Sequence, residues 1–488
     1  MKINRIIFLL TAALAAVSCL GPKPDCSVPC RFREGALELK TPARPAGQEN
    51  ALKLTAEPID TVRVGFVGLG MRGSDAIRRF TYIEGAMITA ICDLEPERVD
   101  SALEFLRGNT RRKAMDVDGA SGGAEVAGSV SDPLCFSGEE GWKQLCESPE
   151  VDLVYVCTHW QLHTPIAVYA MEHGKHVAVE VPAAMSIAEC WQLVNTCERT
   201  RRHCMMLENC VYDFYEMTAL NMAQQGLFGE IYHAEGAYIH NLDPFWDEYW
   251  DNWRLKYNAA HRGDNYPTHG IGPVCQALNI HRGDRMDYVV SMDTKSVHGA
   301  QKAAGSLGTG DFANGDHTVS LIRTAGGHQI EIQHNVYGAR PYSRMYQLVG
   351  SEGFATKYPS QSFSVDASKL SSKEVYAALN PERAAGKAAF DSLCAEFKHP
   401  ITAYYERKAR EVGGHGGMDF IMDSRLIYCL RNGLPLDEDV YDAAEWSCLT
   451  ELSRLSIEAG SVPVKVPDFT RGDWDVLDGL TFAPCPGE

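Results

Sequence analysis

A tyrosine and a histidine three positions apart, Tyr266 and His269, are the best candidates for acid–base chemistry in this sequence. Pro267 suits the first position of a helix, which predicts Tyr266 at the helix cap and His269 in the first turn. A helix N-terminus favours a phenolate and disfavours an imidazolium. A free tyrosine costs about 4 kcal/mol to ionise at pH 7, so a neighbouring cation is needed, and Arg254 can supply it. A core tyrosine and a helix-start histidine are the ordinary structural alternatives.

A glycine-rich segment offers a second kind of chemistry, the binding of phosphate. The β-branched run Val62–Val67 is followed at once by Gly68-Leu69-Gly70-Met71-Arg72-Gly73, and a helical pattern begins at Ser74. Strand, glycine loop and helix together predict a dinucleotide site, with backbone N–H groups at the pyrophosphate. Asp93 ends the next strand, and a carboxylate there accepts the ribose hydroxyls of NAD and repels a 2′-phosphate. Arg72 is a small argument for NADP, so NAD is favoured.

The elements around these residues predict a doubly wound parallel sheet. Buried strands at 151–157 and 175–180 alternate with helices, so polar residues past their carboxyl ends share one edge of the sheet. His163, Glu180 and Asn209 lie at that edge. The segment 107–132 is rich in Gly, Ser, Ala and charge, which predicts a surface loop.

The second half of the chain predicts an antiparallel sheet. Alternating strands near 230–240, 285–294, 317–323, 328–336 and 345–350 are joined by glycine-containing turns. One face is expected to pack on helices and the other to close over the nicotinamide, while a helical pattern at 437–459 packs back on the body. The predicted fold class is an α/β N-terminal Rossmann domain (58–210) plus an α+β C-terminal domain (211–488) with an open, mainly antiparallel sheet.

The N-terminus predicts export. Residues 1–19 combine Lys2 and Arg5 with an apolar run too short to span a bilayer, and small residues precede Cys19. This resembles a lipoprotein signal in which Cys19 is lipidated, with ordinary signal cleavage as the alternative. Residues 20–57 are then expected to be a tether, in which Cys26 and Cys30 could pair. The prediction is an exported protein on the periplasmic or surface side of a bacterial membrane, held only by its lipid anchor.

Composition excludes several classes of protein. Hydrophobic residues make up 45% of the 488-residue chain, which is typical of a large globular core and not of a disordered or fibrous protein. The net charge of -18 argues against nucleic acid as a partner, because acidic surfaces repel phosphate backbones. No motif has the spacing of a metal site, so no metal is expected. Whether the chain forms homo-oligomers is left open.

Ten motifs give the chain a family resemblance. They are GLGMRG, CTHWQLH, EVP, LENCVY, GAYIH, NWR, YPTHGIGPV, NIHRGDRMDYVVSM, RPYSRMYQLVGSEG and GGHGGMDF. The chain resembles the Gfo/Idh/MocA dehydrogenases and, within them, glycoside hydrolase family 109, an NAD-dependent branch acting on N-acetylgalactosaminides. Most Gfo/Idh/MocA members have a lysine where this chain has Val181. The chain departs from family 109 at His159, in the insertion near 107–132, and in added acidic and aromatic residues between Tyr238 and Arg254.

The resemblance implies roles for individual residues. The implied NAD-binding residues are Gly68, Gly70, Met71, Arg72, Gly73, Asp93, Trp160, Gln161, Leu162, His163, Glu180, Val181 and Asn209. The implied substrate-binding residues are Tyr238, Arg254, Tyr266, Pro267, Thr268, His269 and Tyr342, with Tyr266 and His269 catalytic. His415, among four glycines, is left out of the catalytic set.

The implied reaction is hydrolysis of terminal N-acetylgalactosamine from a glycan without net use of NAD. Transient oxidation at carbon 3 acidifies the proton on carbon 2, the glycosidic oxygen leaves by elimination, water adds, and the ketone is reduced again. A sugar oxidoreductase with net NAD turnover is the alternative, and Val181 argues against it. A sugar-binding surface lipoprotein with a vestigial cofactor site is the second alternative.

Overall fold

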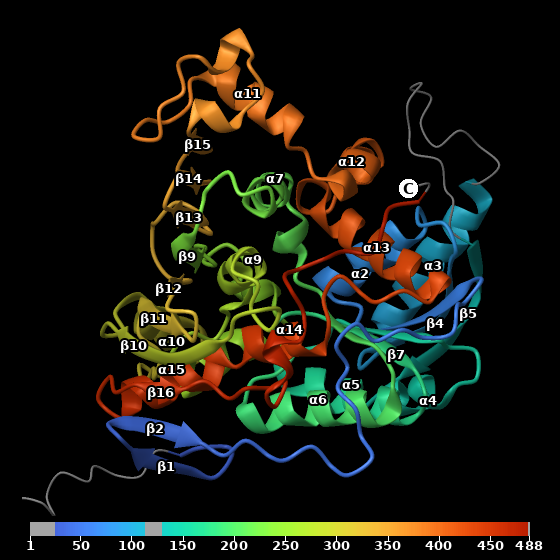
Figure 1. Ribbon diagram of the computed structural model, residues 1–488. Coiled ribbons are helices and arrows are strands. Elements are labelled where there is room, and N and C mark those ends of the chain that lie inside the picture. The colour runs from blue at the N-terminus through green and yellow to red at the C-terminus, as the bar shows by residue number, and fades with distance from the viewer. Residues whose placement is uncertain (1–24, 113–128, 487–488) are drawn as a thin grey trace, which may run out of the picture.

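The computed structural model describes residues 25–112 and 129–486. Within these ranges the chain forms two sheets with helices packed between them (Figure 1). The predicted signal peptide with Cys19, and most of the predicted loop at 107–132, lie outside the described residues. None of the helices in the described ranges has the length and hydropathy needed to cross a bilayer.

Six parallel strands form the N-terminal sheet, in the order β5-β4-β3-β6-β7-β8. Their bounds are β3 (Val62–Val67), β4 (Ala86–Asp93), β5 (Ser129–Ser137), β6 (Leu153–Val156), β7 (His176–Val179) and β8 (Cys204–Met206). The central strands are apolar runs buried on both faces, as a sheet with helices on each side requires. The predicted doubly wound parallel sheet is confirmed.

Helices from both halves of the chain cover this sheet. The N-terminal half supplies α2 (Met71–Phe80), α3 (Pro96–Arg112), α4 (Gly141–Glu147), α5 (Trp160–Glu172) and α6 (Ile187–Thr200). The C-terminal half returns α13 (Met418–Asn432), which contacts β3. A fully buried ion pair, Arg79 to Asp423 at 2.8 Å, joins α2 to α13. The C-terminal half therefore packs directly on the Rossmann sheet, across the domain boundary predicted at residue 210.

A ten-stranded sheet forms the other half, in the order β1-β2-β16-β10-β11-β12-β9-β13-β14-β15. The bounds are β1 (Cys30–Arg33), β2 (Ala36–Leu39), β9 (Ile231–Ile239), β10 (Met286–Asp293), β11 (Thr318–Thr324), β12 (Gln329–Asn335), β13 (Gln347–Gly350), β14 (Gly353–Thr356), β15 (Ser362–Val365) and β16 (Val464–Lys465). Pairs β12–β9 and β16–β2 are parallel and the others antiparallel. The five predicted strands are present, and the mainly antiparallel sheet is confirmed.

The remaining helices are α7 (Phe214–Gln224), α8 (Trp253–Ala260), α9 (Thr268–Ala277), α10 (His298–Ser306), α11 (Lys387–Glu396), α12 (Pro400–Val412), α14 (Val440–Ser447) and α15 (Leu449–Glu458). Helix α9 packs closely on β9 at Gly236 and Gly270: a Cβ on Gly236 would overlap the Gly270 carbonyl, and one on Gly270 would overlap the backbone N of Ala237. Helices α7 and α9 lie on the side of this sheet that faces the Rossmann half (Figure 1). The opposite face leaves Met292 and Leu321 exposed. This opposite face was expected to close over the nicotinamide. That expectation was wrong, because helices fill the space between the two sheets.

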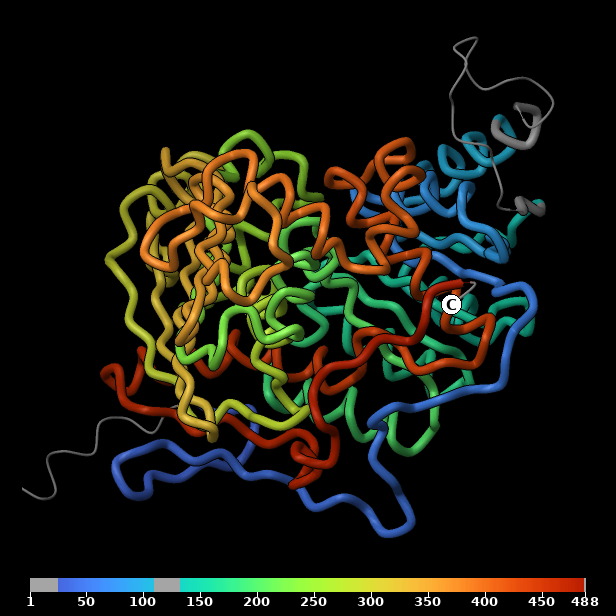
Figure 2. Tube along the Cα trace, turned by 45° about the horizontal axis from the view of Figure 1, so that its top comes forward, coloured from blue at the N-terminus to red at the C-terminus, as the bar shows by residue number. Residues whose placement is uncertain are grey.

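Residues 25–57 differ from the predicted tether. Cys26 and Cys30 form a disulfide, and the hairpin β1–β2 joins the ten-stranded sheet through β16. The segment then runs along the lower edge of the molecule toward the Rossmann half (Figure 2). Leu37, Ala51 and Leu54 are buried. Tertiary contacts with distant residues stabilise this Pro- and Gly-containing segment, and a local pattern does not reveal such contacts.

Candidate active site

The glycine loop between β3 and α2 has the shape that a dinucleotide needs. Gly68 has a φ of +92°, and a Cβ on Gly73 would overlap the carbonyl oxygen of Gly68. Gly70 instead opens to a cavity, and the nearest atom to a Cβ there is Arg98 Nη1 at 3.7 Å. Two glycines therefore allow the tight turn and the close helix packing, and the third leaves room for a pyrophosphate at the start of α2.

Asp93 closes this loop from the end of β4. One carboxylate oxygen accepts the Leu69 N–H at 2.6 Å and the other accepts the Glu95 N–H at 3.0 Å. Arg98 lies 3.8 Å from the same carboxylate. Asp93 lines a cavity of about 440 Å³ that runs along Gly68, Gly70 and Leu162. The position fits the ribose contact predicted for it.

A second cavity of about 390 Å³ continues the first. The two share lining residues at the start of α2 and after β6, namely Met71, Arg72, Cys157 and Thr158, and they also share Tyr249 and Trp253 from the C-terminal half. The second cavity also contains Trp160, His163, Glu180, Val181 and Asn209. The two cavities form one cleft, with the predicted cofactor residues along one wall.

Arg72 is oriented away from the ribose end of the cleft. Its Nε donates to Glu180 at 2.7 Å, and its Nη1 donates to Asp419 at 3.1 Å. Asn209 donates to the other oxygen of Asp419 at 2.5 Å. The guanidinium is thus committed to two carboxylates, and the argument that Arg72 favours NADP fails.

Tyr266, His269 and Arg254 converge in the second cavity, as predicted. The Arg254 guanidinium carbon lies 4.5 Å from the centre of the Tyr266 ring and 5.9 Å from that of Tyr238. The ring centres of Tyr266 and His269 are 5.0 Å apart. Helix α9 begins at Thr268 with Pro267 as its cap, so Tyr266 precedes the cap by one residue, within the usual uncertainty of helix ends.

Burial decides the charge state of Tyr266. It raises the pKa of Tyr266 well above the usual range, and the neighbouring Tyr238 adds to this, whereas Arg254 opposes it. The expectation that Arg254 and the helix end favour a phenolate was therefore wrong for the protein alone, and Tyr266 is a phenol at neutral pH. The guanidinium donates to the Tyr249 hydroxyl at 2.8 Å, but its buried Nε and Nη2 have no partner among the described residues. Unpaired buried donors in a cleft are available to a ligand.

Four predicted residues do not line the cleft, and the first of them, Gly73, packs against the carbonyl of Gly68 instead. The exposed Gln161 side chain lies 2.8 Å from the His159 ring and lines a separate cavity. Pro267 and Thr268 are buried and are not part of the cleft lining. They form the first turn of the helix that positions His269. The other two predicted sugar contacts, Tyr238 and Tyr342, do line the cleft.

Sequence reasoning missed several residues of the cleft and its support. His240 lines it, and its Nδ1 lies 2.9 Å from the Tyr238 hydroxyl. Burial, with the nearby charge of Arg254, lowers the pKa of His240 to about 4, so the ring is neutral. Phe245 and Tyr249 also line this cavity, in the acidic and aromatic segment between Tyr238 and Arg254. The alternation of β9 could have identified His240, since it follows Tyr238 on the same face.

Two groups of possible metal ligands occur among the described residues. They are Glu208, Cys210 and His269, and His281, Asp439 and Asp442. In the first, Glu208 pairs with His269. In the second, Asp442 is held by Arg282 at 2.6 Å and His281 by Glu445 at 2.7 Å. Each group combines two residues that are close in sequence with a distant histidine, which is why the sequence shows no complete metal motif.

Two family models match the chain. Residues 62–208 match the oxidoreductase family with an NAD-binding Rossmann fold, and residues 212–476 match the C-terminal domain of glycosyl hydrolase 109. A glycosyl hydrolase family 109 protein of Bacteroides thetaiotaomicron is 54% identical, covering 92% of this chain and 93% of its own. One from Phocaeicola vulgatus is 53% identical, covering 96% and 97%.

Solved structures share the fold at low identity. An oxidoreductase domain protein from Kribbella flavida has a TM-score of 0.61 at 18% identity, covering 84% of this chain and all of its own. A levoglucosan dehydrogenase in complex with NADH and levoglucosan has a TM-score of 0.60 at 16% identity, with the same coverage. The Rossmann half binds NAD, and the protein is an enzyme that uses it. With a matching C-terminal model over more than half of its length and relatives above 50% identity, the chain belongs to glycoside hydrolase family 109.

Proposed function

We propose that the protein hydrolyses terminal N-acetylgalactosamine linkages by transient oxidation at carbon 3 of the sugar. The observation that supports this best is the cleft itself. An acid–base pair, Tyr266 and His269, and a buried arginine with free donors lie in direct continuation of the NAD groove. A cleft that only cut the glycosidic bond directly would need a carboxylate pair and no cofactor.

Bound NAD supplies a hydride acceptor for carbon 3 and a hydride donor for the ketone at the end of the cycle. The chain must hold the sugar and move protons. Arg254 offers Nε and Nη2 to sugar oxygens, with Tyr238 and Tyr342 alongside. His269 accepts the proton of the carbon 3 hydroxyl, passes it to solvent, and then accepts the proton of carbon 2; it returns one proton to each position in the second half of the cycle. Tyr266, a phenol at neutral pH, donates a proton to the departing glycosidic oxygen.

The replacement of lysine by Val181 supports this reaction over net dehydrogenation. Val181 is buried and lines the cleft, where it can neither donate nor accept a proton. The proton transfers therefore pass to Tyr266, just before the cap of α9, and to His269 in its first turn. An enzyme that regenerates its cofactor also gains nothing by releasing it, so NAD should co-purify.

Release of p-nitrophenol from α- and β-linked N-acetylgalactosaminides without added NAD tests the activity. Turnover in deuterium oxide should place deuterium at carbon 2 of the released sugar, because that carbon is deprotonated during elimination. An unlabelled sugar from an active enzyme would exclude the proposed route. Stoichiometric accumulation of NADH would instead favour a sugar oxidoreductase, and a protein without nucleotide or turnover a binding lipoprotein.

The acid–base residues give the first mutational prediction. Tyr266→Phe and His269→Ala should each lower kcat about 10²–10⁴-fold, which is the usual contribution of a proton-transfer group. NAD content, measured from the absorbance of the nucleotide released on denaturation, should stay at the wild-type level. Near-wild-type rates in both variants would show that other residues transfer the protons.

We further propose that the protein is exported and anchored by lipid on Cys19. The support is the sequence of residues 1–19, with its basic start, short apolar run and small residues before the cysteine. Cys19→Ala should give a soluble or unprocessed protein. Unchanged mass and membrane fractionation would exclude the anchor.

A further inference from the structure

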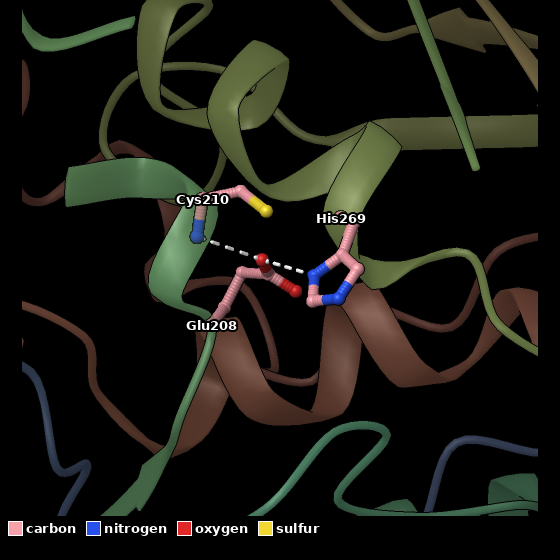
Figure 3. Close-up of side chains that lie close together, drawn as sticks. All are labelled: Glu208, Cys210 and His269. Carbon is pink, nitrogen blue, oxygen red and sulfur yellow. Dashed lines mark hydrogen bonds and ion pairs between the residues drawn. The ribbon is translucent and has the colours of Figure 1, made fainter. Parts of the chain in front are cut away.

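Glu208 lies directly behind His269, on the side away from the cleft. It follows β8 and caps the short helix at Asn209–Tyr212. One carboxylate oxygen lies 2.6 Å from His269 Nδ1 and also accepts the Cys210 N–H at 3.1 Å (Figure 3). Glu208 is fully buried and is not part of the cleft lining, whereas His269 is half-buried and is part of it.

Packing fixes the Glu208 side chain in this place. A Cβ on Gly272 would lie 3.0 Å from Glu208 Cγ and 3.0 Å from the Trp446 ring. The absence of a side chain at Gly272 thus makes room for the glutamate between α9 and α14. Glu208 is thus fully buried and closely packed, with its carboxylate directed toward His269.

His269 is the side chain that pairs with the Glu208 carboxylate. In the described part of the chain, the ion pair of Glu208 is with His269. Burial alone would raise the pKa of Glu208, but the charge and hydrogen bond of His269, with the Thr268 side chain and the Cys210 N–H, bring it below the usual value. A second buried carboxyl, Glu438, is close by, and burial together with the Glu208 charge raises its pKa well above the usual range. Glu208 is therefore ionised beside a neutral Glu438.

We propose that Glu208 is the positioning residue of His269, holding its Nδ1–H so that Nε2 faces the cleft as the proton-transfer atom. An ionised carboxylate only accepts hydrogen bonds, so the ring nitrogen that faces it must be protonated. A neutral His269 then has its lone pair on Nε2, and the imidazolium formed when Nε2 takes a proton is stabilised by the fixed negative charge. This role rests on the proposed function in that His269 transfers protons.

Cys210 is the third polar side chain of this group. Its thiol donates to Asn209 Oδ1 at 3.4 Å, and burial raises the pKa of the thiol well above the usual range. The thiol is therefore paired with the neighbouring amide.

Two variants of Glu208 separate positioning from packing. Glu208→Gln keeps the shape and removes the charge, and it should lower kcat by about 10²-fold or more while KM and NAD content stay near wild type. Glu208→Asp keeps the charge at a shorter reach and should retain more activity than the glutamine variant. Glu438→Gln is the matched control, an equally buried and already neutral neighbour, and should turn over at the wild-type rate.

The imidazole proton gives a readout that needs no substrate. In the proton NMR spectrum of the NAD-bound protein, the Nδ1–H of His269 should resonate at low field, assigned by its loss in His269→Asn. The signal should move upfield or vanish in Glu208→Gln and persist in Glu438→Gln. A wild-type protein without it, or a folded glutamine variant with wild-type kcat, would overturn the proposal. If the wild type released no p-nitrophenol, the proposed reaction would be excluded. The NMR signal would still show whether Glu208 holds the Nδ1–H of His269.

Discussion

Arg254 has a buried charge without a carboxylate partner among the described residues, and four aromatic rings surround it. Its guanidinium carbon is 4.5 Å from the Tyr266 ring centre and 5.1 Å from that of Trp160, and Nε and Nη2 are unpaired. Stacking and a fork of donors are properties of arginine that lysine lacks. Arg254→Lys should therefore raise KM for the sugar about tenfold or more, a loss of roughly 1.4 kcal/mol of binding.

NAD content should be unchanged in that variant, because the arginine lies in the sugar end of the cleft. Arg262→Lys provides the comparison. Arg262 lies outside this cleft and forms a two-point pair with the Asp293 carboxylate. Equal KM values for the two variants would mean that the Arg254 donors do not bind the sugar.

Asp264 should make the stability of the folded protein depend on pH. Its carboxyl is buried, and it accepts the Tyr266 N–H at 3.0 Å. Burial raises the pKa of Asp264 to about 7, against the smaller opposing effect of that hydrogen bond. Since the folded state binds this proton more tightly than the unfolded state, the stabilisation is complete below pH ~4 and is lost as pH rises toward 7. Asp264→Asn should remove up to about 4 kcal/mol of that pH dependence.

The measurement is the thermal midpoint of both proteins between pH 4 and 8. The thermal midpoint of the variant should rise relative to that of the wild type as pH increases, because asparagine can still accept the Tyr266 N–H without ionising. Parallel curves for the two proteins over this range would show that Asp264 does not bind a proton in the folded state.

At the scale of elements, Gly70 and Gly73 serve different purposes in the loop between β3 and α2. A Cβ on Gly73 would overlap backbone, whereas one on Gly70 would enter the groove and meet little protein. Gly70→Ala should fold normally but bind NAD roughly tenfold or more weakly, since the pyrophosphate can no longer approach the backbone. Gly73→Ala should lower both thermal stability and NAD content.

Calorimetry and the nucleotide content of the purified proteins check these outcomes. Gly305→Ala in α10 is the control, because a Cβ there meets nothing within 4 Å and alanine favours a helix. A Gly70→Ala protein with full NAD content would mean that the cofactor does not approach this turn closely.

Local patterns predicted the elements that bind the cofactor, and they failed where distant residues meet. The strand before Gly68 and the alternation of β9 follow from short runs of residues. The pair of Glu208 and His269 does not, because 61 residues separate them and each has an ordinary local explanation. Likewise, the charge state of Tyr266 depends on burial by several segments, which outweighs the helix end that the sequence suggested.

At the scale of the whole molecule, residues 25–57 connect the two halves. Ser27 donates to Glu451 at 2.5 Å, more than 400 residues away, beside the ten-stranded sheet. Arg44 pairs with Glu198 of α6 at 3.3 Å and with Asp473 at 2.9 Å. The Tyr441 hydroxyl of α14 accepts the Ala51 N–H at 2.9 Å. The segment thus links the Rossmann half, the sheet and the helices between them, and is part of the folded body.

This arrangement predicts the effect of shortening the chain. A protein that begins at Asp25 should have the same thermal midpoint as the full-length chain. One beginning at Pro58 should melt several degrees lower, because it loses the burial of side chains such as Leu37 and Leu54, worth about 1.5–3 kcal/mol each. Leu54→Ala should cost about 2–5 kcal/mol by itself, and Lys40→Ala, at an exposed position, close to nothing. If the protein beginning at Pro58 melted with the longer one, the contacts of this segment would not stabilise the fold, and the tether predicted from composition would describe it better.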